Sequence, residues 1–170
     1  GYAMPYGNDP VTARVRDRIR ELFEAPGASV HLVATGTAAN ALALATLVEP
    51  WQTVFCHRTA HVEEDECGAP EFFAGAAKLT LVDGPDGKMD PAALAAAIAE
   101  SGAKGVHGVQ PGAVTITQPT ERGTVHSLDE IRALAGVARE NGLPVHMDGA
   151  RFANAVAALG CSAAEMTWKA

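Results

Sequence analysis

The sequence has few cysteines, no concentration of positive charge and no long apolar run, and each absence disfavours a class of protein. Three cysteines, an odd number with irregular spacing, argue against a disulfide framework and favour the reducing cytoplasm. Lysine and arginine form no cluster and the formal net charge is −7, which disfavours nucleic-acid binding. No stretch approaches the length of a membrane span or has the pattern of a signal peptide. A chain of 170 residues that is 48% hydrophobic can bury a core, so we expect one compact cytoplasmic unit.

Segments with strand and helix patterns alternate along almost the whole chain, and the first helix is amphipathic, as expected of a helix packed on the core. Such alternation predicts an α/β fold with a mainly parallel sheet and helices on both faces. Predicted strands occupy residues 30–34, 53–56, 77–82, 106–110, 113–117 and 144–147. Predicted helices occupy residues 10–25, 37–48, 91–100, 128–141 and 150–159, and another begins at Ser162.

The end of the last predicted strand carries the most unusual residues. Asp148, Gly149 and Arg151 lie where this strand leads into a helix, and in an open α/β sheet ligands bind at the carboxyl ends of the strands. An aspartate there can hold a ring nitrogen protonated, glycine lets a flat ligand approach the backbone, and arginine matches a carboxylate at two points. The alternative is an aspartate that caps the helix beside a surface arginine.

A second candidate site is the turn from Thr35 to Asn40, between a predicted strand and a helix. Its glycine and hydroxyl groups, together with the positive end of the helix dipole, suit a phosphate. A simple threonine cap is the alternative. The turn matches neither the Rossmann fingerprint nor the P-loop, so a nucleotide is not favoured.

A third candidate is His61, which follows the strand predicted at residues 53–56. One alternative is a zinc site made of Cys56, His57, His61 and Cys67, but their spacing fits no zinc pattern and the second histidine of a zincin helix is missing. The other is that the His61 imidazole covers a flat cofactor ring. Three strand ends therefore carry the candidate residues, which is the argument for a single site.

Two runs of sequence resemble one known family. The run from His146 to Ala155 and the run from His61 to Pro70 are similar to the low-specificity L-threonine aldolases and their β-eliminating relatives. These are pyridoxal 5'-phosphate (PLP) enzymes of the aspartate-aminotransferase fold type I. The resemblance covers essentially the whole chain, and it implies the PLP-binding large domain of that fold.

The resemblance also implies a reaction, the retro-aldol cleavage of β-hydroxy-α-amino acids to glycine and an aldehyde. It implies these cofactor-binding residues, with Asn40 as a nearby support: Gly36, Thr37, His61 and Asp148. Arg151 would hold the substrate carboxylate, and His61, through water, would take the β-hydroxyl proton. The alternatives are β-elimination by another PLP lyase of the superfamily, or an inactive fragment. No role is assigned to Thr120, Glu121 or Arg122.

A lysine in the context that the family places around its Schiff-base lysine is missing. The lysines available are Lys78, Lys88, Lys104 and Lys169. The resemblance implies that the cofactor-binding lysine lies beyond Ala170, so that residues 1–170 form part of the large domain and a smaller C-terminal domain follows. We expect the longer subunit to be a homo-oligomer, a dimer or tetramer, with a small amino-acid substrate and neither nucleic acid nor membrane as a partner.

This expectation can be tested on the chain itself. Mixed with PLP and reduced with borohydride, the 170-residue chain should carry no specific pyridoxyl group and should show no aldolase turnover. Peptide mapping after reduction is the measurement. A pyridoxyl group found specifically on Lys169 would contradict the expected position of the lysine.

Overall fold

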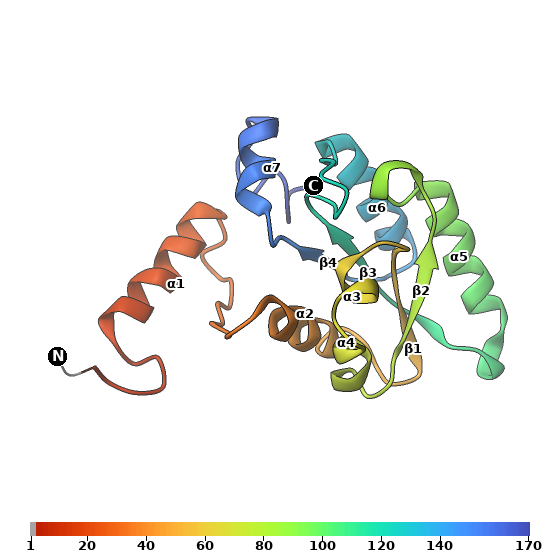
Figure 1. Cartoon of the computed structure of the whole chain (residues 1–170), viewed down its shortest axis with the longest axis horizontal. Helices are drawn as coiled ribbons and strands as arrows, with labels where there is room; N and C mark the ends of the chain where they lie inside the picture. The colour runs from red at the N-terminus through yellow and green to blue at the C-terminus, as the bar shows by residue number, and fades with distance from the viewer. Residues whose placement is uncertain (1–2) are drawn as a thin grey trace.

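The computed structural model describes residues 3–170, which form an α/β fold around a four-stranded sheet (Figure 1). The strands are β1 (Gln52–His57), β2 (Lys78–Val82), β3 (Gln110–Thr117) and β4 (Val145–Asp148). Their order is β2-β1-β3-β4, and every neighbouring pair is parallel. The carboxyl ends of all four strands therefore lie at one edge of the sheet, which confirms the predicted fold class.

Helices connect the strands, and proline and capping residues define where several of them begin. Asp9 and Asp90 each accept hydrogen bonds from the first turn of the helix that follows, and each helix opens with a proline. Ser127 and Glu130 form the predicted capping box. The helices are α1 (Pro10–Leu22), α2 (Gly36–Ala45), α3 (His61–Glu64), α4 (Ala69–Phe73), α5 (Pro91–Ala103), α6 (Leu128–Glu140) and α7 (Phe152–Leu159). Among residues 3–170 no helix has both the length and the apolar character needed to cross a bilayer.

The sheet is covered by helices on both faces, as predicted. Neighbouring residues of β1 point to opposite sides: Cys56 packs with Leu44 of α2, whereas Phe55 packs with residues of α5 and α6. The second face includes Leu94 and Leu134, both fully buried. Because both faces are covered, β1 and β3 are buried almost continuously and not at every second residue.

The strand predicted at residues 30–34 is wrong. This segment pairs with no strand of the described chain, and Leu32 and Val33 are exposed. Apolar and β-branched composition favours an extended backbone, but a strand also needs a neighbour for its amide and carbonyl groups. The segment instead leads from α1 into α2.

The prediction of two separate strands, at residues 106–110 and 113–117, is also wrong. Residues Gly105–His107 form a short 3₁₀ turn in which Val106 is 95% exposed, and β3 runs without a break from Gln110 through Pro111 and Gly112. The proline is tolerated because the register with β1 shifts at this point. A Cβ on Gly112 would lie 2.8 Å from the Gln52 and Val48 side chains, so only glycine fits there.

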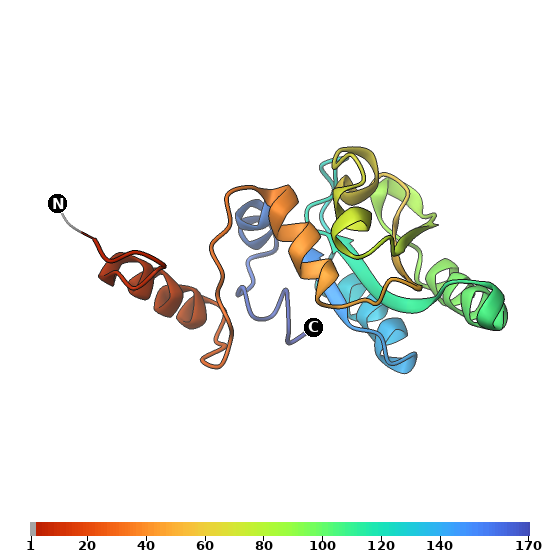
Figure 2. The same cartoon turned by 90° about the horizontal axis from the view of Figure 1, so that it is seen from below.

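Helix α1 does not pack on the core, contrary to the sequence prediction. None of its residues is buried, and it lies apart from the sheet in both views (Figures 1 and 2). Its carboxyl end is nevertheless anchored. The Phe23 ring stacks on Phe152 at 5.3 Å, and the Trp168 Nε1 donates to the Phe23 carbonyl oxygen at 2.7 Å.

The helix predicted to begin at Ser162 does not form, although its capping bonds do. Ser162 and Glu165 exchange the two expected hydrogen bonds, at 2.8 and 3.2 Å. The following residues form turns. The Thr167 amide donates to the Ala164 carbonyl oxygen, three residues back, at 3.2 Å, and not to that of Ala163 four residues back, as an α-helix would require. Lys169 therefore lies in a turn and not in a helix.

Leu94 of α5 packs on the sheet whereas Leu42 of α2 is exposed, so truncating each should change the stability of the fold by a different amount. Leu94→Ala should lower the free energy of unfolding by about 2–5 kcal/mol, because the side chain is fully buried and its removal leaves a cavity. Leu42→Ala, on the exposed face of α2, should change it by less than about 0.5 kcal/mol. Urea denaturation measures both. Equal unfolding midpoints for the two variants would contradict the assigned core.

Candidate active site

The carboxyl edge of the sheet brings His61, the amino end of α2 and Asp148 into one group connected through Asn40 and Glu66, and Arg151 lies three residues beyond Asp148. Asp148 is the last residue of β4, His61 opens α3 directly after β1, and Gly36 opens α2. Arg151 follows β4 by three residues and precedes α7. The group forms because parallel strands end at the same edge and because one side-chain amide, from Asn40, joins α2 to β4.

Asp148 is 7% exposed and uses both carboxylate oxygens. Oδ1 accepts a hydrogen bond from the Ala150 amide at 3.0 Å, and Oδ2 accepts one from the Asn40 Nδ2 at 2.9 Å. Each oxygen keeps a further lone pair for a donor. The cap alternative does not describe this residue, because the N-cap position of α7 is Arg151 and has no side-chain cap.

The amino end of α2 has both features that the sequence left as alternatives, a threonine cap and free amides that suit a phosphate. Thr35 is the N-cap, and its Oγ1 accepts from the Ala38 amide at 3.1 Å. The Gly36 and Thr37 amides have no acceptor among residues 3–170. A Cβ placed on Gly36 would meet no atom within 4 Å, so the space in front of the turn is open. Two free amides at a helix amino end can bind an anion.

Glu66 belongs to the group although the sequence assigned it no role. Its side chain is fully buried, and its Oε1 accepts from the same Asn40 Nδ2 at 3.1 Å. Burial raises the pKa of the Glu66 carboxyl, and the nearby negative charge of Asp148 adds to that rise; the hydrogen bond from Asn40, the charge of His61 and the neighbouring Thr37 hydroxyl oppose it. Sequence reasoning missed this residue because it lies in an acidic run that is typical of a solvated surface.

His61 lies at the rim of the group, with its side chain 40% exposed. Its Nε2 is 3.9 Å from the Glu66 Oε1, and its Nδ1 is 3.7 Å from the Asp65 Oδ2. Glu66 and Asn40 therefore link His61 to Asp148. The imidazole is accessible to a ligand from the side that these contacts leave open.

The residues of the zinc alternative are engaged elsewhere. Burial raises the pKa of the Cys56 thiol to about 12, so it is a poor source of thiolate. The His57 ring nitrogens contact the Thr59 hydroxyl at 3.0 Å and the Gly84 carbonyl oxygen at 3.2 Å. Within residues 3–170, no cluster of three or more histidine, cysteine or acidic side chains is arranged to hold a metal ion.

Arg151 is partly exposed and uses one terminal nitrogen of its guanidinium. Its Nη2 donates to the Pro119 carbonyl oxygen at 3.3 Å and to the Glu121 Oε1 at 3.2 Å. Nη1 and Nε have no partner among the described residues, so they remain available to a carboxylate. Glu121 is thus a second residue that sequence reasoning left unassigned. Thr120 beside it is buried and bonds to the Thr124 hydroxyl, a structural contact.

Packing favours glycine at position 149. A Cβ there would lie 3.2 Å from the Phe152 Cβ, so glycine allows α7 to begin close to the end of β4. The expectation that Gly149 lets a flat ligand approach the backbone therefore has a structural alternative. Either reason favours glycine at this position.

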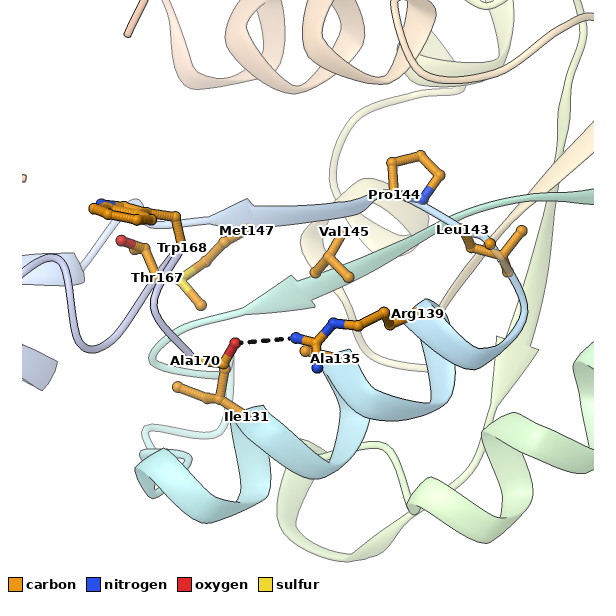
Figure 3. Close-up of a pocket in the computed structure, with 11 residues that line it drawn as sticks. Ile131, Ala135, Arg139, Leu143, Pro144, Val145, Met147, Thr167, Trp168 and Ala170 are labelled. Atoms are coloured by element: carbon orange, nitrogen blue, oxygen red, sulfur yellow. Dashed lines mark hydrogen bonds between the residues drawn. The ribbon is translucent and has the colours of Figure 1, made fainter. Parts of the chain in front are cut away.

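A cavity of about 700 Å³ lies away from these residues, between α6 and β4 (Figure 3). Its walls are largely apolar, with Val145, Met147 and Trp168 among them, and the Arg139 Nη2 donates to the Ala170 carbonyl oxygen at 3.3 Å. None of the predicted site residues lines it. The candidate site is therefore the open carboxyl edge of the sheet and not this cavity.

The chemistry of the edge fits a flat anion with a basic ring nitrogen. Free amides at Gly36 and Thr37 suit its negative group, and the buried Asp148 suits a protonated nitrogen. His61 offers a ring face, and Arg151 offers two free donor nitrogens for a second anion. These are the groups by which a pyridine ring with a phosphate arm can be recognised.

Comparisons with known proteins agree with this chemistry. A family model described as beta-eliminating lyase matches residues 3–170. The low specificity L-threonine aldolase of Pseudomonas aeruginosa is 48% identical over the whole chain. The solved threonine aldolase of Leishmania major superposes with a TM-score of 0.90 at 31% identity, over 97% of this chain and 48% of that one.

A more distant structure shows how widely the fold is shared. The N-succinyldiaminopimelate aminotransferase of Mycobacterium tuberculosis matches with a TM-score of 0.61 at 25% identity, over 86% of this chain and 37% of that one. The chain spans about half the length of the curated relatives it matches, 48% in the Pseudomonas aeruginosa protein. The activity of those relatives is a property of proteins about twice as long as this chain.

The loop that carries Glu121 is anchored by a buried histidine whose protonation should weaken the fold. The Gln118 side chain bonds to both the amide and the carbonyl of His126 at 2.9 Å. Burial, aided by the charge of Lys88, lowers the pKa of His126 to about 4, so the ring is neutral at neutral pH in the folded chain. The unfolded chain takes up this proton near pH 6.5, so stability falls as the pH drops from 6.5 to about 4.

We expect this proton to account for about 3 kcal/mol of that loss. The measurement is urea denaturation of the wild type and His126→Gln at neutral and acidic pH, and the variant should lose less stability on acidification. His107→Gln, at an exposed histidine, is the matched control and should behave as the wild type. Parallel pH dependence in all three proteins would contradict the assignment.

Proposed function

Because this chain belongs to the beta-eliminating lyase family, we propose that it is the cofactor-binding part of a PLP-dependent lyase. The proposed reaction is retro-aldol cleavage of β-hydroxy-α-amino acids, of the threonine, allo-threonine or phenylserine type, to glycine and an aldehyde. The observation that carries the proposal is the buried Asp148 at the end of β4, joined through Asn40 to the helix whose amino-end amides are free.

Each part of the cofactor has a candidate partner in the chain. Asp148 would hold the ring nitrogen protonated, and the amides of Gly36 and Thr37 would hold the phosphate. His61, at the rim of the site, would cover the ring. When bound, PLP supplies an electron sink for the electrons of a broken bond at the substrate α-carbon.

The remaining groups would bind the substrate and move its proton. Arg151 can receive the α-carboxylate at Nη1 or Nε, which are free, and a two-point contact would also use Nη2 in place of Glu121 or the Pro119 carbonyl. His61, half exposed and connected to Glu66, would accept the β-hydroxyl proton directly or through water. Loss of that proton allows the bond between the α- and β-carbons to break.

The alternative, β-elimination, would use the same aspartate and arginine. The identity to a protein named low specificity L-threonine aldolase favours aldol cleavage. Assays of L-threonine, L-allo-threonine and phenylserine against a β-elimination substrate separate the two reactions. A third possibility, an inactive fragment, concerns the chain alone.

The positions of the lysines support the proposal that the Schiff-base lysine lies beyond Ala170, in a longer homo-oligomeric subunit whose large domain includes residues 1–170. Lys88 contacts Glu130 at 2.9 Å, and Lys169 contacts Glu24 at 2.7 Å. Lys78 begins β2 and therefore lies at the end of the sheet opposite to Asp148. None of these ammonium groups is placed beside Asp148.

Asp148→Asn tests the central role in a protein that carries these residues together with the expected lysine. The change removes the charge that keeps the ring nitrogen protonated and preserves the side-chain volume, so aldol cleavage should fall by at least about a hundredfold. Steady-state kinetics measures the loss, and circular dichroism checks the fold. Asp129→Asn, on the exposed surface of α6, is the control. Near-normal cleavage by the Asp148 variant would disprove the role.

A further inference from the structure

Glu66 is buried and incompletely satisfied. It lies between α3 and α4, with its side chain fully buried. Its Oε1 accepts the hydrogen bond from Asn40, whereas its Oε2 is buried with no hydrogen-bond partner among the described residues. A buried carboxylate anion with one neutral donor is unfavourable, because nothing compensates for the water that it has lost.

Glu66 and Asp148 share one donor, the side-chain amide of Asn40. The Asn40 Nδ2 has two protons, and one goes to each carboxylate, at 3.1 and 2.9 Å. An amide carries no net charge, so it can bridge the two oxygens but cannot neutralise two anions. Two negative charges held this close and away from water repel each other, and such a pair lowers its energy by keeping one proton.

The surroundings decide which carboxyl keeps the proton. Asp148 has a second donor, the Ala150 amide, at 3.0 Å, and it lies at the end of β4 where a ligand can reach it. Glu66 has no second donor and lies deeper than Asp148. Burial raises the pKa of Glu66 and the charge of Asp148 raises it further, which agrees with the geometry.

We propose that Glu66 is a positioning residue that keeps its proton, so that Asp148 is the single negative charge held by the Asn40 amide. The inference rests on the proposed function, because a lone charge on Asp148 is what a protonated ring nitrogen requires. With Glu66 neutral, the amide stays oriented toward Asp148, and no second anion competes for the cation of the ring.

The other groups near Glu66 shift its protonation equilibrium in opposite directions. Protonated His61, with its Nε2 at 3.9 Å from the Glu66 Oε1, stabilises the ionised form, as does the hydroxyl of Thr37 on α2. Asp148 on β4 stabilises the protonated form. These opposing influences allow each neighbour to be tested through the titration of Glu66.

The first experiment follows the Glu66 carboxyl carbon by NMR in the isotope-labelled 170-residue chain as the pH is raised from acid to neutral. Glu66 should titrate above the ordinary value of 4.5 and should still carry its proton when the pH reaches neutrality. Asp148→Asn should lower that midpoint by removing the like charge, and His61→Gln, at a half-exposed side chain, should raise it. Glu64→Gln, at an exposed position in the same segment, should leave it unchanged.

Two results of the titration would overturn the proposal. One is a Glu66 carboxyl that is already ionised at neutral pH in the wild type, even if a variant failed to fold. A midpoint that is identical in the wild type, Asp148→Asn and His61→Gln would also overturn it.

The second experiment measures PLP binding to the same chain by fluorescence or calorimetry. Glu66→Gln mimics the protonated acid, so the dissociation constant should change by less than about threefold, whereas Asn40→Leu should weaken binding by more than about tenfold. A large loss in Glu66→Gln would show that the anion is required and would overturn the inference. If the wild type binds no PLP, the proposed function fails, while the titration still reports on the carboxyl pair.

Discussion

One side-chain amide between two buried carboxyl groups is the contact on which the site depends. Asn40, Glu66 and Asp148 come from a helix, a connecting segment and a strand end that are far apart in the sequence. Their hydrogen bonds fix the amino end of α2 beside the end of β4. Removing the amide would leave two buried acceptors unsatisfied, at a cost of about 1–3 kcal/mol each. The contact therefore stabilises the fold and aligns the free helix amides with the aspartate.

Much of the fold and part of the site could be predicted from the sequence because the determinants are local. Asp90 with Pro91, and Ser127 with Glu130, begin helices through contacts within one turn. The β4 strand and Asp148 are recognisable for the same reason, since a buried strand followed by Asp-Gly and a helix is a continuous pattern. Strand ends meet at one edge in any parallel sheet, so grouping the candidate residues required only the fold class.

The rest depended on contacts between distant parts of the chain. Glu66 has the same composition around it as a solvated helix, and only the folded chain places it against Asn40. Residues 30–34 have a strand pattern but find no neighbour, and β3 passes through Pro111 because its register with β1 shifts there. At Ser162 the expected cap forms, yet the Thr167 amide bonds to the carbonyl three residues back, so turns follow and not a helix.

The anchoring of α1 ties its carboxyl end to the last residues of the described chain. The Trp168 indole and the Lys169 ammonium bind the Phe23 carbonyl and the Glu24 carboxylate, both at 2.7 Å. Trimming the first helix as far as residue 24 would thus remove the acceptors of two side chains near Ala170. A fragment that begins after residue 24 therefore lacks two contacts of its carboxyl-terminal segment, so the two boundaries of an expressed fragment have to be chosen as a pair.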